Sequence, residues 1–140
     1  MKAGVSAYID SGAYIAFLVR SDLLHDEVVS LFASPPRAWY TSVLVVSETY
    51  SWFLHRLGEE AARTFRRLVE DLSGLEILDS DPVHRAATWE KLDRLRGHKL
   101  TYVDASSLVW LEKLGIGTVW GTDHHLGIEG ADVVPSSSLP

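Results

Sequence analysis

The sequence predicts an α/β fold, a three-layer α/β/α sandwich with a mainly parallel central sheet. Short apolar runs, each long enough for one strand, alternate along the chain with stretches of helical periodicity. Strands that alternate with helices favour a parallel sheet with helices packed on its faces. Glycine, proline and acidic residues stand at the junctions, where they end or begin the elements. The length of 140 residues predicts a single domain, residues 1–140.

The elements can be justified in order from these junctions. The first strand combines apolar and β-branched residues and ends where Ser11-Gly12 breaks the run. Pro35-Pro36 ends the second helix, and Asp81-Pro82 is a strong start for a later one. The expected elements are a strand at Ala7–Ile9, helices at Ala13–Arg20 and from Asp22 or His25 to about Ala33, a strand at Ala38–Thr41, helices at Ser42–Leu57 and Glu59–Leu72, a strand at Leu75–Leu78, helices from Asp81 to about Arg96 and from Thr101 to Gly115, strands at Gly117–Trp120 and Asp132–Val134, and a Pro/Ser tail.

One element is ambiguous in sequence. Val43–Val46 alone would fit a strand, because β-branched residues favour pleated structure. We favour a helix, because Ser42 is a good N-cap and the apolar residues continue at helical spacing to Leu57. Gly58 then stands where a glycine commonly ends a helix.

Composition restricts the kind of protein. Apolar residues make up 46% of the chain and five residues are tryptophan, which is typical of a packed globular protein. The absence of cysteine excludes disulfides and thiolate metal sites. Lys2 and the apolar residues after it resemble a signal peptide only faintly, because Asp10 interrupts the run, and Ala13–Val19 is too short to span a bilayer. We therefore expect a cytoplasmic protein with no membrane segment.

Four acidic residues stand where the fold can bring them together. Asp10 and Asp123 each follow an expected strand, and α/β sheets bind ligands beyond the carboxyl ends of their strands. Asp104 opens a helix, and Glu48 lies in the most apolar stretch of the chain, where a buried carboxylate needs a cation or a proton. Crowded acids repel one another, and a divalent cation relieves the repulsion. All-oxygen ligands suit Mg²⁺ or Mn²⁺ better than zinc, and such an ion can activate water against a phosphodiester.

Each acid also has a purely structural explanation. Asp10 can cap a helix, and Asp123 can form an Asx turn after its strand. Thr101 and Asp104 have the spacing of a capping box, which taken alone is the better explanation. Glu48 can face solvent or pair with an arginine. Only the four acids taken together favour the metal site.

Four short segments carry these acids in a characteristic order. They are Tyr8-Ile9-Asp10-Ser11, Ser47-Glu48, Leu100-Thr101-Tyr102-Val103-Asp104-Ala105 and Gly121-Thr122-Asp123-His124-His125-Leu126. The ordered set resembles a PIN domain, and most of all the small ribonucleases that serve as VapC-type toxins. The resemblance implies a metal-dependent endoribonuclease that cleaves RNA, with the four acids as catalytic residues and ligands of Mg²⁺ or Mn²⁺. It further implies that the hydroxyls of Thr122 and Ser11 contact substrate or water.

The resemblance also implies protein partners. Such toxins form homodimers and hold an antitoxin segment in an apolar groove, here near the helix that carries Tyr50, Trp52 and Phe53. A simple core is the other explanation for these three residues, and we slightly favour it.

The net charge of −6 argues against a broad nucleic-acid-binding surface. With the four acids matched by metal the charge becomes −6 + 4 = −2, which leaves room for a local basic groove. Solvated faces are the expected place of most basic residues, and one or two are expected to contact RNA phosphates. The basic residues in question are Arg63, Arg66, Arg67, Arg94, Arg96 and Lys99.

Three rival functions fit less well. A non-catalytic module that binds RNA or a protein partner would not need the intact set of acids. A phosphatase with Asp10 as phosphoryl acceptor would want a second acid where Gly12 stands. Metal-free catalysis by His124 and His125 would need two adjacent side chains to cooperate, and adjacent side chains usually point apart. A contact with phosphate at the rim of the site is the favoured role for these histidines.

Overall fold

The computed structural model describes residues 5–135, so Lys2 and the Pro/Ser tail from residue 136 onward lie outside the described residues. The strands are β1 (Ser6–Ile9), β2 (Ala38–Ser42), β3 (Leu75–Leu78), β4 (Thr118–Trp120) and β5 (Asp132–Val134). The helices are α1 (Ser11–Leu18), α2 (His25–Ala33), α3 (Val43–Leu57), α4 (Glu59–Asp71), α5 (Pro82–Arg94), α6 (Tyr102–Leu114) and the short 3-10 helix η2 (His124–Gly127).

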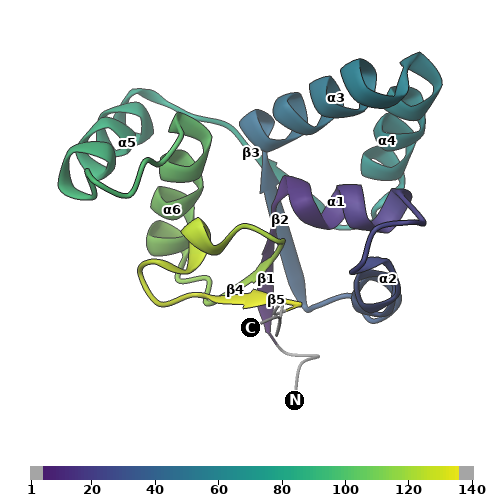
Figure 1. Ribbon diagram of the computed structural model, residues 1–140. Coiled ribbons are helices and arrows are strands. Elements are labelled where there is room, and N and C mark those ends of the chain that lie inside the picture. The colour runs from purple at the N-terminus through teal and green to yellow at the C-terminus, as the bar shows by residue number, and fades with distance from the viewer. Residues whose placement is uncertain (1–4, 136–140) are drawn as a thin grey trace.

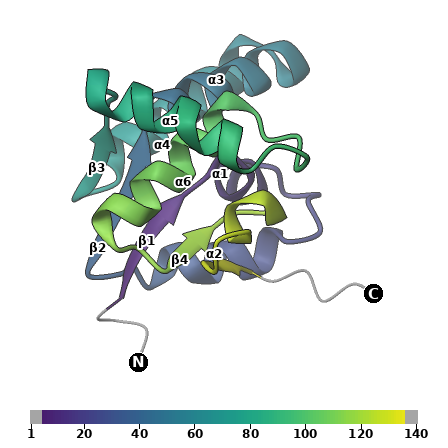
Figure 2. The ribbon, with the colours of Figure 1, turned by 90° about the vertical axis from the view of Figure 1, so that its left-hand side faces the viewer.

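These elements form three layers. The five strands are all parallel and lie in the order β3-β2-β1-β4-β5. Helices α1 to α4 cover one face of the sheet, and α5 and α6 cover the other (Figure 1). Figure 2, turned by 90°, shows α5 and α6 lying across the front of the strands. The predicted α/β/α sandwich with a parallel sheet is confirmed.

The chain reverses its direction across the sheet after β3. It builds β1, β2 and β3 toward one edge, then returns to the other side of β1 to add β4 and β5. Because parallel crossovers are right-handed, the reversal moves the later helices to the opposite face. The carboxyl ends of β1 and β4 therefore form a topological switch point, the place where open α/β sheets bind ligands.

Local sequence signals explain most element boundaries. The stretch after Ser42 is helical as predicted, because the Ser42 hydroxyl accepts a hydrogen bond from the Val45 N–H at 3.1 Å. The prediction for α1 was wrong by two residues at each end, since the helix runs from Ser11 to Leu18. Strand β1 ends at Ile9, and Asp10 directly after it already occupies the N-cap position of α1. The 3-10 turn η2 was not predicted.

The core lies on both faces of the central strands. Tyr8 and Ile9 of β1 are fully buried, and Phe53 of α3 stacks on Phe65 of α4 with ring centroids 5.6 Å apart. The apolar residues near Phe53 have different environments: Trp52 is half-buried and Tyr50 is 39% exposed. No helix within residues 5–135 is long and apolar enough to cross a bilayer.

Candidate metal centre and active-site cleft

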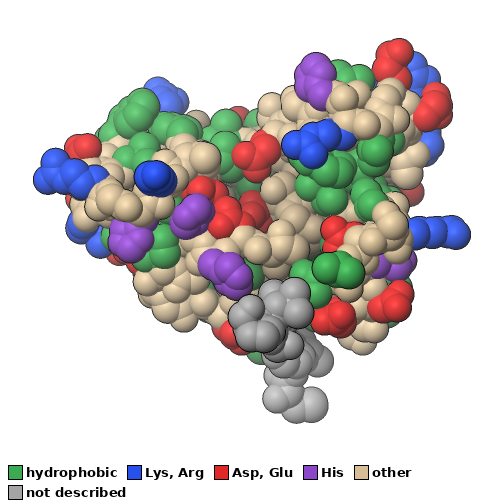
Figure 3. Space-filling view, viewed as in Figure 1, with side chains coloured by type: hydrophobic (Ala, Val, Ile, Leu, Met, Phe, Trp, Pro, Cys, Tyr) green, Lys and Arg blue, Asp and Glu red, His purple; other side chains and the backbone are tan. Residues whose placement is uncertain are grey.

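A cleft of about 590 Å³ opens beyond the carboxyl ends of β1 and β4. Figure 3 shows acidic side chains gathered in the hollow between the two arms of the molecule, with basic side chains on either side. The residues that line the cleft are Asp10, Ser11, Ile15, Glu48, Ser51, Trp52, His55, Arg56, Lys99, Thr101, Asp104, Asp123 and His125. All four acids singled out in the sequence therefore line one cavity.

Asp10 is the most deeply placed of these acids, with 4% of its surface exposed. Its backbone N–H donates to the carbonyl of Trp120 at 2.9 Å, which ties the end of β1 to β4. Asp10 occupies the N-cap position of α1, as one explanation of the sequence had it, but its carboxylate makes no capping hydrogen bond to the helix. The pKa of Asp10 is raised to about 7, mainly because burial disfavours the charged form; the Ser11 N–H acts in the lowering direction, and the negative charges of Glu48, Asp123 and Asp104 add to the rise.

Asp104 and Asp123 combine local structural roles with places in the cleft. Asp104 and Thr101 form the predicted capping box, with both reciprocal N–H···O bonds at 3.1 Å. Asp123 accepts a bond from the His125 N–H at 2.9 Å and so begins η2 as an Asx turn. Burial raises the pKa of Asp104, and the charge of Asp123 raises it further. The structural explanation of these acids and their convergence are therefore compatible.

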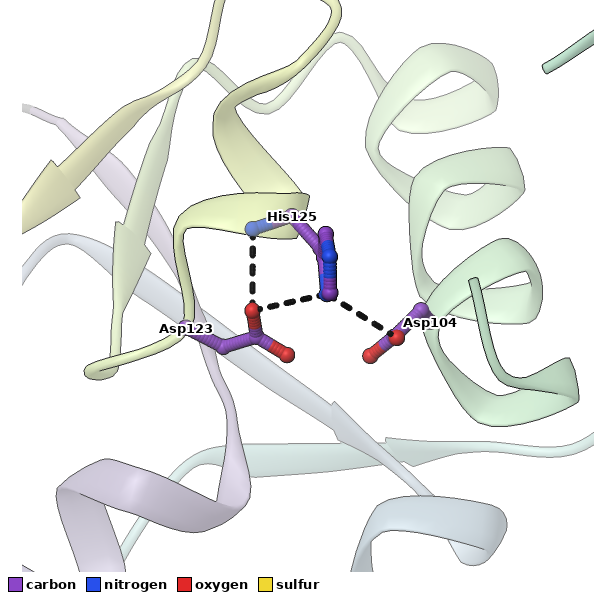
Figure 4. Close-up of side chains that lie close together, drawn as sticks. All are labelled: Asp104, Asp123 and His125. Atoms are coloured by element: carbon purple, nitrogen blue, oxygen red, sulfur yellow. Dashed lines mark hydrogen bonds and ion pairs between the residues drawn. The ribbon is translucent and has the colours of Figure 1, made fainter. Parts of the chain in front are cut away.

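His125 joins the two carboxylates, and the sequence analysis did not predict it. Its Nδ1 lies 3.1 Å from Oδ1 of Asp123 and 3.5 Å from Oδ2 of Asp104 (Figure 4). The three side chains offer donor atoms that all lie within 4.8 Å of one another. His124 lies elsewhere, on a neighbouring pocket, so the adjacent histidines point apart as predicted. No sequence pattern singled out His125, because its contact with Asp104 is made only when η2 packs against α6.

The structure decides between the two alternatives for Glu48. The apolar neighbourhood in sequence suggested a buried carboxylate and the structural explanation a solvent-facing one, and Glu48 is exposed. Helix α3 turns Val45, Thr49 and Phe53 toward the core, and the next face of the helix carries Glu48 to the cleft. Partial loss of hydration there still raises the pKa of Glu48, and the charges of the facing acids raise it further. Glu48 forms no ion pair with any residue in the described part of the chain.

The two predicted hydroxyl contacts are in different places. Ser11, at the start of α1, lines the cleft with the acids. Thr122 lines a second pocket of about 290 Å³ with His124. A Cβ on Gly12 would lie 2.9 Å from the Thr122 backbone nitrogen and would also meet the Thr122 hydroxyl. Gly12 therefore permits the close approach of the turns after β1 and β4 that brings Asp10 beside Asp123.

A buried lysine supports this arrangement from outside the cleft. Lys91 of α5 is 3% exposed, and its Nζ donates to Glu112 of α6 at 2.6 Å and to Glu129 at 2.7 Å. Glu129 follows η2, so the lysine joins the segment after Asp123 to the helix that carries Asp104. The sequence analysis did not single out Lys91.

The donor set fits a divalent cation. Asp10, Asp104 and Asp123 supply carboxylate oxygens, Glu48 can add another, and His125 adds a nitrogen donor to the predicted all-oxygen set. Asp10 is buried without an ion pair among residues 5–135, which is costly unless a proton or a metal compensates its charge. Carboxylate oxygens are preferred by Mg²⁺ and Mn²⁺.

Comparison with known proteins agrees with this geometry. The family model of the PIN domain matches residues 7–126. No curated protein matches the chain at a significant level.

Solved structures share the fold. VapC20 of Mycobacterium tuberculosis, described as a Sarcin-Ricin loop cleaving toxin, is 23% identical, with a TM-score of 0.81 over 89% of this chain and 95% of that one. FitAcB of Neisseria gonorrhoeae is 14% identical, with a TM-score of 0.64 over 91% and 95% of the two chains. VapBC2 of Rickettsia felis, solved with a DNA fragment from its promoter, is 12% identical, with a TM-score of 0.61 over 92% and 96%. Because the family model matches residues 7–126, the chain belongs to the PIN-domain family.

Proposed function

We propose that the protein is a metal-dependent endoribonuclease that hydrolyses RNA phosphodiesters and acts as the toxin of a toxin–antitoxin pair. The observation that carries the proposal is the convergence of Asp10, Glu48, Asp104 and Asp123 from four separate elements into one cleft. Membership of the PIN-domain family supports it. The similarity to VapC20, described as a toxin that cleaves the Sarcin-Ricin loop, supports it as well.

The residues divide the chemistry between them. Asp10, Asp104 and Asp123, with Glu48, would hold Mg²⁺ or Mn²⁺, which when bound stabilises charge on the phosphoryl group and lowers the pKa of water. Glu48 is the exposed acid with a raised pKa, so it is suited to take the proton of the attacking water. In the same proposal Ser11 and Thr122 contact substrate or water.

A second surface of the molecule suggests where a protein partner binds. An apolar groove of about 410 Å³ between α3 and α4 includes Val43, Val46, Tyr50, Phe65 and Val69. Val43 and Tyr50 are 42% and 39% exposed, which is typical of an interface rather than a closed core. We propose that an antitoxin segment binds this groove, that the toxin forms a homodimer, and that both act in the cytoplasm.

The test is cleavage of a mixed RNA pool by the purified protein with Mg²⁺, with Mn²⁺ and with EDTA. We expect metal-dependent fragments that disappear in Asp10→Asn and Asp104→Asn. Asp71→Asn is the matched control, because Asp71 is an exposed acid at the end of α4. Full activity in both cleft variants, or cleavage that persists in EDTA, would contradict the proposal. Absence of both cleavage and metal binding by calorimetry would instead favour a non-catalytic module.

A further inference from the structure

We propose that Trp52 stacks a base of the bound RNA strand and that Arg56 and Lys99, on opposite walls of the cleft, bind the flanking phosphates. This inference rests on the proposed function and names the residues that hold the substrate. The Trp52 ring, the Arg56 guanidinium and the Lys99 ammonium form what we call the rim, and Asp10, Asp104 and Asp123 form the floor.

One wall of the rim is a stripe on α3. Glu48, Trp52 and Arg56 are spaced four residues apart, so they lie one above another on one face of the helix. The Arg56 guanidinium lies 5.5 Å from the centroid of the Trp52 ring, and the ring packs edge-on against Phe53 at 5.2 Å. The indole and the guanidinium therefore lie together one helical turn from Glu48, and RNA bases stack on both kinds of group.

The other wall carries Lys99 in an unusual backbone conformation. Its φ is +57°, and it is the one non-glycine residue with positive φ within residues 5–135. Glycine adopts this conformation without the clash of a Cβ, so a lysine there implies a use for its side chain. Lys99 is exposed and lines the cleft, and it forms no ion pair with the described residues.

Position in the cleft, together with the lack of an acidic partner, distinguishes Arg56 and Lys99 among the basic side chains of this acidic protein. Arg66 pairs with Glu70, Arg94 with Glu129, and Lys91 with two glutamates. Arg56 and Lys99 have no acidic partner in the described part of the chain, although they flank a cleft that holds four acids. Free cations on both sides of an acidic floor suit a strand whose phosphates cross from one wall to the other.

The aromatic platform selects for unpaired nucleotides. In a duplex each base is stacked between its neighbours, so its face is not available to an aromatic side chain. An unpaired base can turn outward and stack on Trp52 while its phosphate approaches the floor. The stacked base then belongs to a nucleotide beside the cleaved bond, because Trp52 lies one helical turn from Glu48.

The test is equilibrium binding of a short fluorescent RNA and of its blunt duplex, in EDTA at low salt, so that metal-dependent cleavage plays no part. We expect the single strand to bind at least about tenfold more tightly than the duplex. We expect Trp52→Leu to lose about tenfold in affinity for the single strand and Trp52→Phe to lose much less, because only Phe keeps an aromatic face. Trp89→Leu is the control, since Trp89 is 60% exposed and lies outside the cleft.

Salt dependence tests the two cations separately. Arg56→Gln and Lys99→Gly should each reduce the slope of log affinity against log salt by about 0.7, the value for one phosphate contact on a single strand. Arg63→Gln, an exposed arginine on α4, should leave the slope unchanged. These two variants also decide the matter if Trp52→Leu fails to fold.

Three results would overturn the inference. They are equal binding of duplex and single strand, wild-type affinity of Trp52→Leu, and unchanged salt slopes in both cation variants. Each can occur while metal-dependent cleavage persists, in which case the proposed function stands and the inference alone fails. If the protein instead prefers single-stranded RNA but shows no metal-dependent cleavage, the inference stands and the proposed function fails.

Discussion

The floor and the rim of the cleft are held in different ways. Asp10 and Asp104 are 4% and 8% exposed, follow or open regular elements, and are fixed by backbone hydrogen bonds to neighbouring segments. Arg56 and Lys99 are exposed side chains that the fold does not need for its core. The difference indicates that the chemistry of this site depends on the architecture of the sheet, whereas substrate choice depends on replaceable surface groups. Substitutions in the floor are therefore expected to change cleavage and stability far more than substitutions in the rim.

The largest effect is expected for Asp10→Asn. Removing this carboxylate should reduce metal-dependent cleavage by at least about a hundredfold, because metal sites are sensitive even to changes around their ligands. The same variant should be more stable than wild type in EDTA at pH 8, since a neutral amide replaces a buried charge. Thermal unfolding with and without Mg²⁺ measures both effects. Lower stability of Asp10→Asn in EDTA would show that the floor is not electrostatically strained.

The pH dependence of the metal-free protein tests the same strain. The pKa of Asp10 is raised from 3.8 to about 7, so the folded state binds this proton more tightly than the unfolded chain. The Asp10 contribution is thus fully favourable below about pH 4 and is lost as the pH rises toward 7, on the order of 4 kcal/mol. Denaturant unfolding from pH 4 to 8 should show a larger loss in wild type than in Asp10→Asn, which keeps only the smaller losses from Glu48 and Asp104.

A smaller loss is expected for Lys91→Met, which tests the remote support of the floor. Glu112 and Glu129 would lose the cation that joins them, which we expect to destabilise the fold more than the loss of an exposed ion pair does and to weaken metal binding. Arg66→Met is the control, because its ion pair with Glu70 is exposed and should contribute less than about 1 kcal/mol. Equal effects of the two substitutions in denaturant titrations would contradict a supporting role for Lys91.

Gly12→Ala tests the close approach of the two strand-end turns. The new methyl group would meet the Thr122 backbone and hydroxyl, so the turn that leads to Asp123 must shift. We expect a loss of about 2 kcal/mol and weaker metal binding, measured by unfolding and calorimetry. Gly117→Ala is the matched control, since nothing lies within 4 Å of a Cβ placed there.

The same contrast explains what the sequence could predict. Asp10 and Asp123 follow strands, and the carboxyl ends of parallel strands lie at one edge of the sheet, so the element junctions were enough to predict that these two acids meet. Asp104 opens a helix, and only the set of four acids and the resemblance to PIN domains predicted that it joins them. The exposure of Glu48 stayed open, because an apolar neighbourhood in sequence does not tell which face of α3 a side chain occupies. Tertiary contacts alone place His125 between two acids, and no local pattern encodes them.

The sequence did not single out Lys99 or Lys91, because the distinguishing features of both residues arise only in the folded structure. Lys99 was one of several basic residues without distinction, until its positive φ and its place on the cleft wall separated it from the paired arginines. Lys91 has the sequence context of an ordinary surface residue of α5, and its burial arises only when α6 and the segment after η2 pack against it.

The smallest effect on stability is expected for Lys99→Gly, and it separates rim from floor most sharply. Glycine relieves the steric cost of φ near +57° but adds freedom to the unfolded chain, so the two contributions nearly cancel. The free energy of unfolding should change by less than about 1 kcal/mol, toward higher stability, while affinity for single-stranded RNA falls. Chemical denaturation and RNA binding on the same preparation measure both. If Lys99 serves RNA binding, the variant should keep its stability and lose affinity. If Lys99 serves folding, the variant should lose both stability and affinity.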